Sequence, residues 1–245
     1  MDEKLNNLII KFGDEKWIDK LYSGEIFMQP LKSYIDLERE EKRKGQGDKN
    51  EASLRSKLID YKFSCENSSE QMDLFLNLLN NGEDATFTFR YKDDERYLTS
   101  CFYKVDAERF VFIGEEDDKK YYQYNFTNEE KEIFSSWGNS ALIINSKVFF
   151  NAIKTCLSNI DSRLGKVNYY CEDNLPEEAL LDYQQKKVSR LFWKDEFFKH
   201  QNEYRFVIAE KSDKGKVVAN LGSLKEISMK YNSSQLVTDG FIYIV

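Results

Sequence analysis

A segment near the C-terminal end of the chain carries a glutamine, a carboxylate and a guanidinium at alternate positions. These are Gln201, Glu203 and Arg205, and all three are expected on one strand that follows His200 and continues to residue 208. Because side chains alternate between the two faces of a strand, all three are expected on one face, about 6–7 Å apart, with the apolar side chains on the other. A carboxylate held there could hydrogen-bond a sugar hydroxyl or stabilise an oxocarbenium-like transition state. The pair Glu203 and Arg205 could equally form an ion pair at a sheet edge or face water.

Two further basic side chains, Lys11 and His200, are candidates for a binding or catalytic role. Lys11 interrupts an apolar run at residues 8–12. A lysine there lies either on an edge strand or at a cleft, where its ammonium could meet a phosphate as a point charge. His200 is the single histidine of the chain, and its place at an element boundary favours a capping or surface role. One histidine excludes sites that need two from one chain, so catalysis is left to a carboxylate.

The elements that must position these residues mix strands and helices without a regular alternation. Asp14 can cap a helix over residues 14–22, and Gly24 suits the left-handed residue that ends one. Aromatic and β-branched runs predict strands over residues 8–12, 25–28, 86–91, 97–105, 109–113, 141–144, 166–171, 201–208, 224–231 and 241–245. We therefore expect a single α+β domain over residues 1–245, with a mixed, mostly antiparallel sheet and flanking helices.

Residues 36–84 are expected to form a charged and helical insertion in that domain. Residues 36–51 are nearly free of apolar side chains, which is typical of a solvated helix end and loop, or of a lid over a site. Residues 69–79 predict an amphipathic helix, because Met72, Phe75 and Leu76 fall on one face.

Composition narrows the classes of function. The 245 residues include 36 Lys and Arg and 43 Asp and Glu, a net charge of −7, which argues against binding bulk duplex nucleic acid. The sequence has no apolar stretch of membrane-spanning length, and its first residues are not typical of a signal peptide. Its four cysteines form no C-x-x-C pair and are expected to be reduced thiols. These features predict a cytoplasmic protein with no membrane attachment.

The chain resembles an uncharacterised bacterial family found in phage-resistance and mobile-element contexts. The resemblance spans the strand-helix-Gly-strand unit at residues 8–28, the G-D-x-x-E run at 47–51, W-G-N-S-A-L-I-I at 137–144, the Q-x-E-Y-R run at 201–205 and the segment 219–228. It implies a phage-defence effector, of abortive-infection or toxin type, for which a protein partner within a defence system is one expectation.

The chain is also similar to the ADP-ribosyltransferase fold. In that fold a first strand carries an Arg or His that contacts NAD, and Lys11 stands at that place here. A late strand carries the catalytic Glu in a Q-x-E motif, as Gln201 and Glu203 do here. The resemblance implies Glu203 and Gln201 as catalytic residues. It implies NAD as cofactor, bound by Lys11, Phe12, Arg205, Thr99 and Ser100.

Three functions are compatible with these patterns. The first is an NAD-dependent ADP-ribosyltransferase-like toxin or defence effector, and the second is a non-enzymatic protein-interaction component of a defence or counter-defence system. The third is a metal-dependent nuclease, for which carboxylates such as Asp48 and Glu51 could hold Mg²⁺. Convergence of Lys11, Gln201 and Glu203 on one cleft would favour the first.

Overall fold

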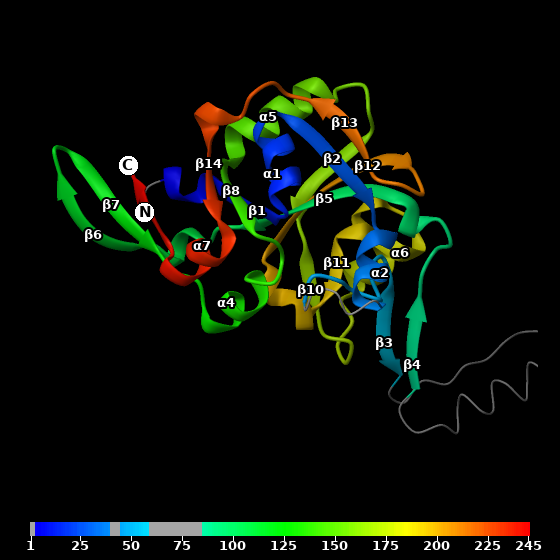
Figure 1. The fold of residues 1–245 in the computed structure, drawn as a ribbon. Helices are drawn as coiled ribbons and strands as arrows, with labels where there is room; N and C mark the ends of the chain where they lie inside the picture. The colour runs from blue at the N-terminus through cyan, green and yellow to red at the C-terminus, as the bar shows by residue number, and fades with distance from the viewer. Residues whose placement is uncertain (1–2, 40–44, 59–84) are drawn as a thin grey trace, which may run out of the picture.

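A forked β-sheet forms the centre of the fold (Figure 1). The structure is a computed structural model and describes residues 3–39, 45–58 and 85–245. The stem of the fork is β5 (Tyr97–Lys104), which pairs along its length with β12 (Glu203–Lys211), and β9 (Ser162–Lys166) lies beyond β12.

The opposite edge of β5 is shared by two strands that then diverge. β1 (Leu8–Gly13) pairs with the end of β5 at Tyr103 and Lys104, whereas β2 (Glu25–Pro30) pairs with its beginning at Leu98 and Thr99. Among the described residues, the three positions of β5 between these contacts have no strand partner on this edge. The sheet therefore opens beside the middle of β5.

Each branch of the fork carries further antiparallel strands. β8 (Ser140–Asn145) and β14 (Ser228–Asn232) extend the β1 branch, and β13 (Lys216–Asn220) extends the β2 branch. Helix α1 (Glu15–Tyr22) connects β1 to β2, so the chain itself bridges the two branches. The positive φ of Gly24, 103°, ends this connection, and the backbone of Gly222 lies so close that a Cβ at Gly24 would not fit.

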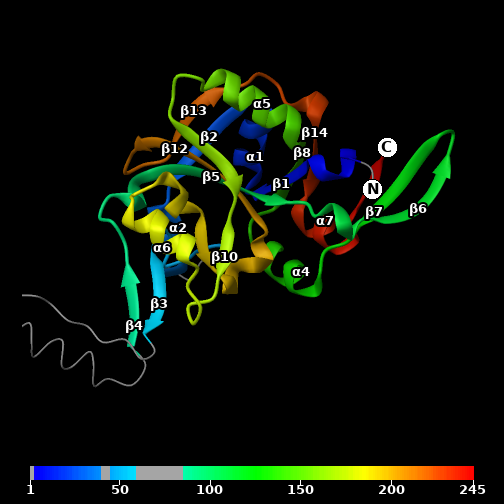
Figure 2. The ribbon, with the colours of Figure 1, turned by 180° about the vertical axis from the view of Figure 1, so that it is seen from behind.

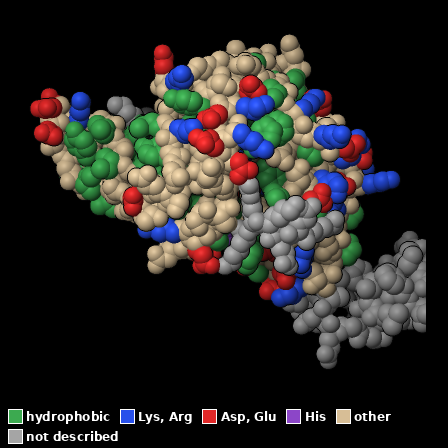
Figure 3. Space-filling view, viewed as in Figure 1, with side chains coloured by type: hydrophobic (Ala, Val, Ile, Leu, Met, Phe, Trp, Pro, Cys, Tyr) green, Lys and Arg blue, Asp and Glu red, His purple; other side chains and the backbone are tan. Residues whose placement is uncertain are grey.

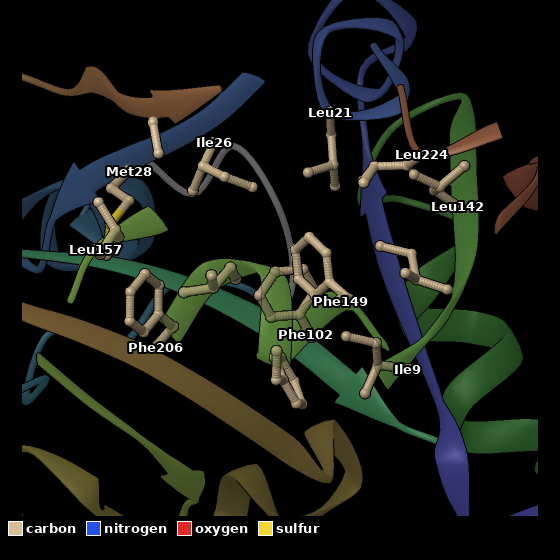
Figure 4. Packing of buried hydrophobic residues seen from close by; sticks show 14 of the residues in the cluster. Ile9, Leu21, Ile26, Met28, Phe102, Leu142, Phe149, Leu157, Phe206 and Leu224 are labelled. Carbon is tan, nitrogen blue, oxygen red and sulfur yellow. The ribbon is translucent and has the colours of Figure 1, made fainter. Parts of the chain in front are cut away.

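Two helices cover one face of the sheet. Ile18 and Leu21 of α1 and Phe149 of α5 (Ser146–Cys156) pack against Ile9, Phe102 and other apolar side chains of the strands (Figure 4). This is the larger apolar core. A second core lies across β1 and β8, where α4 (Asn128–Phe134) and α7 (Ser233–Asp239) pack.

The remaining elements lie around the sheet (Figures 1 and 2). They are α2 (Lys32–Arg39), β3 (Leu54–Leu58), β4 (Ala85–Phe89), β6 (Val111–Glu116), β7 (Lys119–Tyr124), β10 (Asn168–Tyr170), α6 (Glu177–Gln184), β11 (Trp193–Asp195), β15 (Phe241–Ile244) and short 3₁₀ helices. β3 pairs with β4, and β15, β7 and β6 form a separate three-stranded sheet. β10 and β11 form a parallel pair.

The α+β class and the mostly antiparallel sheet are confirmed, with local differences. The predicted strand over residues 166–171 is two strands, because β9 ends at Lys166 and β10 begins at Asn168. The predicted strand over 224–231 begins only at Ser228, after a 3₁₀ turn. Asp14 occupies the N-cap of α1 without a side-chain cap bond, and Asn139 Oδ1 accepts from the Glu15 N–H instead.

The expected insertion is described only in part. Of residues 36–84, the structure describes 36–39 and 45–58, and the predicted helix over residues 69–79 lies outside the described residues. Within the described parts of the chain, every helix is too short or too polar to cross a membrane.

Candidate active site at the fork of the sheet

Two adjoining cavities lie where the sheet divides. The outer cavity has a volume of about 440 Å³ and the inner one about 50 Å³. Lys11, Phe12 and Tyr34 line both of them, and Gln201 and Glu203 line the inner one. The structure therefore brings Lys11, Gln201 and Glu203, from three different elements, to one place.

Glu203 belongs to a closed ring of four buried charges. Arg205 Nε donates to Glu203 Oε1 at 2.5 Å, and Arg205 Nη1 donates to Glu51 Oε1 at 2.7 Å. Lys194 Nζ closes the ring, at 3.2 Å from Glu51 Oε2 and 3.4 Å from Glu203 Oε2. All four side chains are at most 5 % exposed, and the two positive and two negative charges balance. A buried ion pair is tolerated only when its partners are held in this way.

The ring keeps the Glu203 carboxylate ionised. Burial alone would raise its pKa, but the Arg205 guanidinium and the Lys194 ammonium outweigh burial and hold the pKa well below its usual range. Burial would also raise the pKa of Glu51, but the same two cations lower it. Burial would lower the pKa of Lys194, and the two carboxylates raise it instead. The site therefore presents a permanent anion at the wall of the inner cavity.

A local turn brings Gln201 to this ring. β12 begins only at Glu203, so Gln201 is not on the strand as predicted but at the end of the 3₁₀ helix Glu196–Gln201. Asn202 between them has left-handed backbone angles, φ 35° and ψ 51°, which asparagine adopts more readily than most residues. This turn places Gln201 Oε1 2.8 Å from Lys194 Nζ, while Gln201 Nε2 donates to the Gly45 carbonyl at 2.5 Å.

Lys11 lies on an inner strand, between β5 and β8, and not on a sheet edge. Its Nζ donates to the Cys101 carbonyl at 2.7 Å and to Ser100 Oγ at 3.3 Å, both on the stretch of β5 that the fork leaves without a strand partner. Burial lowers the pKa of Lys11, and the charge of Glu203 acts in the opposite direction. The sequence allowed Lys11 either on an edge strand or at a cleft, and the structure places it at a cleft.

Other residues expected to bind the cofactor divide into two groups. Phe12 lines both cavities, and Thr99 and Ser100 line the outer one. The hydroxyl of Thr99 donates to the Phe206 carbonyl at 3.0 Å, so it holds β5 to β12. Arg205 is 1 % exposed and lines neither cavity, and its guanidinium holds the Glu203 carboxylate from the side away from the cavity lining. The interpretation of Glu203 and Arg205 as an edge or solvent-facing pair is wrong, because β12 lies between β5 and β9.

The sequence did not single out Lys194 or Tyr34. Lys194 lies in β11 between Trp193 and Asp195, and its place directly after the apolar run 191–193 was the available signal. Tyr34 comes from α2 and lines both cavities, and burial raises the pKa of its hydroxyl well above the usual range. Burial and then Glu203 raise the pKa of the neighbouring Cys101 thiol to about 12, so this thiol is not a nucleophile at neutral pH.

The described end of the charged segment is not a solvated loop. Asp48 and Glu51 are each 2 % exposed, and Glu51 is part of the ring at the site. Burial raises the pKa of Asp48 to about 7, against the effect of Lys194. His200 lines neither cavity, and its Nδ1 lies 3.1 Å from the Phe197 carbonyl oxygen.

The donor set of the site does not resemble a metal centre. Within residues 3–39, 45–58 and 85–245, no group of three or more His, Cys, Asp or Glu side chains is placed to hold a metal ion. Glu51 and Glu203 are each bound to two cationic side chains, which compete for the oxygens a divalent ion would need.

Comparisons of the chain with protein-family models, with curated proteins and with solved structures gave no match.

Proposed function

We propose that the chain is an NAD-dependent ADP-ribosyltransferase-like enzyme, acting as a bacterial phage-defence or toxin-type effector. One observation carries the enzymatic part of the proposal: Lys11 lines the same cavity at the fork of the sheet as Gln201 and Glu203, which are far from it in the sequence. The cellular role rests on the family resemblance carried by the Q-x-E-Y-R run.

The outer cavity has a volume within the range of small-molecule sites and an aromatic lining. Ligand sites usually measure about 300–1,000 Å³, and the outer cavity of about 440 Å³ falls within that range. Trp17 and Phe27 line it and stack on each other at 4.5 Å, and Phe12 and Tyr34 line the deeper part. These rings offer flat apolar surfaces for a base or a nicotinamide. The Lys11 ammonium is available to the pyrophosphate as a point charge.

Glu203 supplies the electrostatic part of the chemistry. When the glycosidic bond between nicotinamide and ribose breaks, the bonding pair leaves with nicotinamide and the ribose becomes positively charged at C1′. An ionised carboxylate stabilises that charge, and a nucleophile then bonds to C1′ and loses its proton. The 3.4 Å contact between Lys194 Nζ and Glu203 Oε2 is the longest in the ring, so we expect a ribose hydroxyl to replace it.

The test is the turnover of labelled NAD by the wild-type chain and by Glu203→Gln. Glu203→Gln keeps the shape but removes the charge, and we expect at least a hundredfold loss of turnover. Glu130→Gln is the matched control, because Glu130 is also a buried carboxylate bound to an arginine, Arg109, but lines neither cavity. It is expected to retain turnover per folded molecule. Background turnover in all three proteins, with no heat of NAD binding by calorimetry, would reject the proposal.

A further inference from the structure

The three-stranded sheet of β15, β7 and β6 projects from the body of the molecule on the side away from β3 and β4 (Figures 1 and 2). Its outer strand exposes three consecutive apolar residues. Val111, Phe112 and Ile113 are 57 %, 53 % and 51 % exposed. Hydrophobic side chains gather over this hairpin, and acidic ones lie at its tip (Figure 3). Exposed apolar side chains in such a row usually mark an interaction surface.

β6 is also an unpaired sheet edge. Among the described residues it pairs with β7 alone, so the backbone N–H and C=O groups of its outer side have no strand partner. Proteins commonly protect such edges with charges or proline within the strand. The first half of β6 has neither, and a bulge between Phe112 and Gly114 is its one irregularity.

The apolar side chains of β6 lie on both faces of this small sheet. Phe112 stands opposite Tyr122, and their rings lie 5.6 Å apart on one face. Val111 stands opposite Gln123 and therefore points to the other face. Packing a partner on one face would leave the other exposed. A strand added beside β6 would cover parts of both.

The charges at the tip of the hairpin indicate the chemistry of that strand. Residues 115–120 read Glu-Glu-Asp-Asp-Lys-Lys, which gives −4 + 2 = −2. Lys119 and Lys120 stand opposite Glu116 and Glu115 on the β7 side, and in the described structure neither glutamate forms an ion pair. The outer side of both carboxylates is open to a cationic partner.

A second copy of this chain is a poor match for the edge. The base of the hairpin has a net negative charge as well, because Glu108, Glu129 and Asp239 are exposed there against Lys131, and Glu130 neutralises Arg109. Antiparallel pairing of two β6 strands would bring the acidic tip of one copy to the acidic base of the other. Like charges at both ends oppose that arrangement.

We propose that the outer edge of β6 binds an extended segment of a partner protein, adding it as an antiparallel strand. The segment carries apolar side chains beside Val111 and Phe112, and Lys or Arg at its N-terminal end beside Glu115 and Glu116. Main-chain hydrogen bonds supply affinity in this mode, and the side chains supply selectivity. The surface is distinct from the fork of the sheet and does not depend on the function proposed for it.

A defined peptide tests this surface on the full chain. The probe is Lys-Lys-Thr-Val-Thr-Val-Thr, and its acidic counterpart is Glu-Glu-Thr-Val-Thr-Val-Thr. We expect the basic peptide to bind in calorimetry, with at least tenfold weaker binding of the acidic one. Phe112→Asp should weaken binding of the basic peptide at least tenfold, and Glu115→Lys with Glu116→Lys should abolish its preference over the acidic peptide.

The control reverses the same two charges elsewhere. Glu177→Lys with Glu178→Lys changes two exposed acids in the first turn of α6 and should leave binding unchanged. Equal loss in this control would overturn the proposal in favour of non-specific charge attraction. A wild-type chain that dimerises in sedimentation, and becomes monomeric with Phe112→Asp, would assign the edge to a second copy instead. Absence of both peptide binding and dimerisation also rejects the proposal, and thermal unfolding of each variant verifies that it is folded.

Discussion

Two groups of buried opposite charges in this molecule differ in what surrounds them. Arg190 holds Asp94 with two hydrogen bonds, of 2.7 Å from Nε and 2.6 Å from Nη2. Its remaining Nη1 donates to the carbonyls of Lys186 and Lys187. At the fork of the sheet, in contrast, the carboxylate of Glu203 shares its cations with a second carboxylate and lines a cavity.

The difference separates an ion pair that stabilises the fold from one that can take part in a reaction. Neither Arg190 nor Asp94 lines the two cavities at the fork, and the pair fixes two chain segments together. The ring around Glu203 holds an ionised group against a void, where water or a ligand can meet it. Burial and perturbed pKa values occur in both kinds of group, and the neighbouring cavity is what distinguishes them.

The largest expected effect is on the ring. Arg205→Met removes the guanidinium that separates two buried carboxylates, and only Lys194 then remains for both. Breaking a buried pair in this way costs about 3–5 kcal/mol of the free energy of unfolding, measured by denaturant titration. Arg163→Met, on the neighbouring strand but exposed, is the control and should change it by less than about 1 kcal/mol. A loss below about 1 kcal/mol for Arg205→Met would mean that the ring is not coupled as described.

Loss of the pair between Arg190 and Asp94 should lower the free energy of unfolding without changing NAD turnover. Asp94→Ala leaves Arg190 buried with two carbonyls and no anion, and we expect a loss of about 3 kcal/mol in the free energy of unfolding. NAD turnover per folded molecule should stay at the wild-type value, because Asp94 lines neither cavity at the fork. Parallel loss of turnover and stability would erase the distinction between the two groups.

A smaller effect should appear in the pH dependence of stability. Burial raises the pKa of Asp48 to about 7 in the folded chain, whereas an unfolded aspartate titrates near pH 4 (roughly 3.9). Between these values the folded state keeps a proton that the unfolded state has lost, so stability falls as the pH rises toward 7. The lowered pKa values of Glu203 and Glu51 act in the opposite direction, and their contribution is lost only as the pH falls below their usual range.

Asp48→Asn isolates this effect, because an amide does not titrate. We expect the free energy of unfolding of the wild type to fall by about 2 kcal/mol relative to Asp48→Asn between pH 5 and pH 7. Denaturant titrations of both proteins across that range measure it. Parallel profiles for the two proteins would show that Asp48 is ionised throughout.

The sequence predicted the strands better than it predicted what lies between them. Runs of apolar, aromatic and β-branched residues located β1, β5 and β12, and the Q-x-E run indicated Glu203 before its position was known. The composition of such a run is a local property, so one sequence contains it. The fork is not local, because it depends on β1 and β2 pairing with different ends of β5.

The main error was the prediction of a solvated charged segment, and the cause of its burial is also non-local. A run of acids and bases is usually solvated, because isolated ions do not enter a protein interior. Here Glu51 enters the interior since Arg205 and Lys194, about 150 residues away in the sequence, neutralise it there. The extended register that would put Gln201 on β12 failed for a simpler reason, because Asn202 adopts the left-handed conformation and ends the strand at Glu203.

The smallest expected effect concerns Lys11, which belongs to neither group of ion pairs. Among the residues that the structure describes, its ammonium donates hydrogen bonds to two neutral acceptors on β5 and to no carboxylate, and burial lowers its pKa. Lys11→Met should weaken NAD binding about tenfold, or about 1.4 kcal/mol, with the free energy of unfolding changed by less than about 1 kcal/mol. Lys11→Arg should bind at least as tightly as the wild type, since a guanidinium forms bidentate bonds with phosphate. Calorimetry measures the affinity of all three proteins for NAD. Equal affinities would place the pyrophosphate away from Lys11. Glu203 would then remain as the residue that distinguishes the fork from the Arg190 pair.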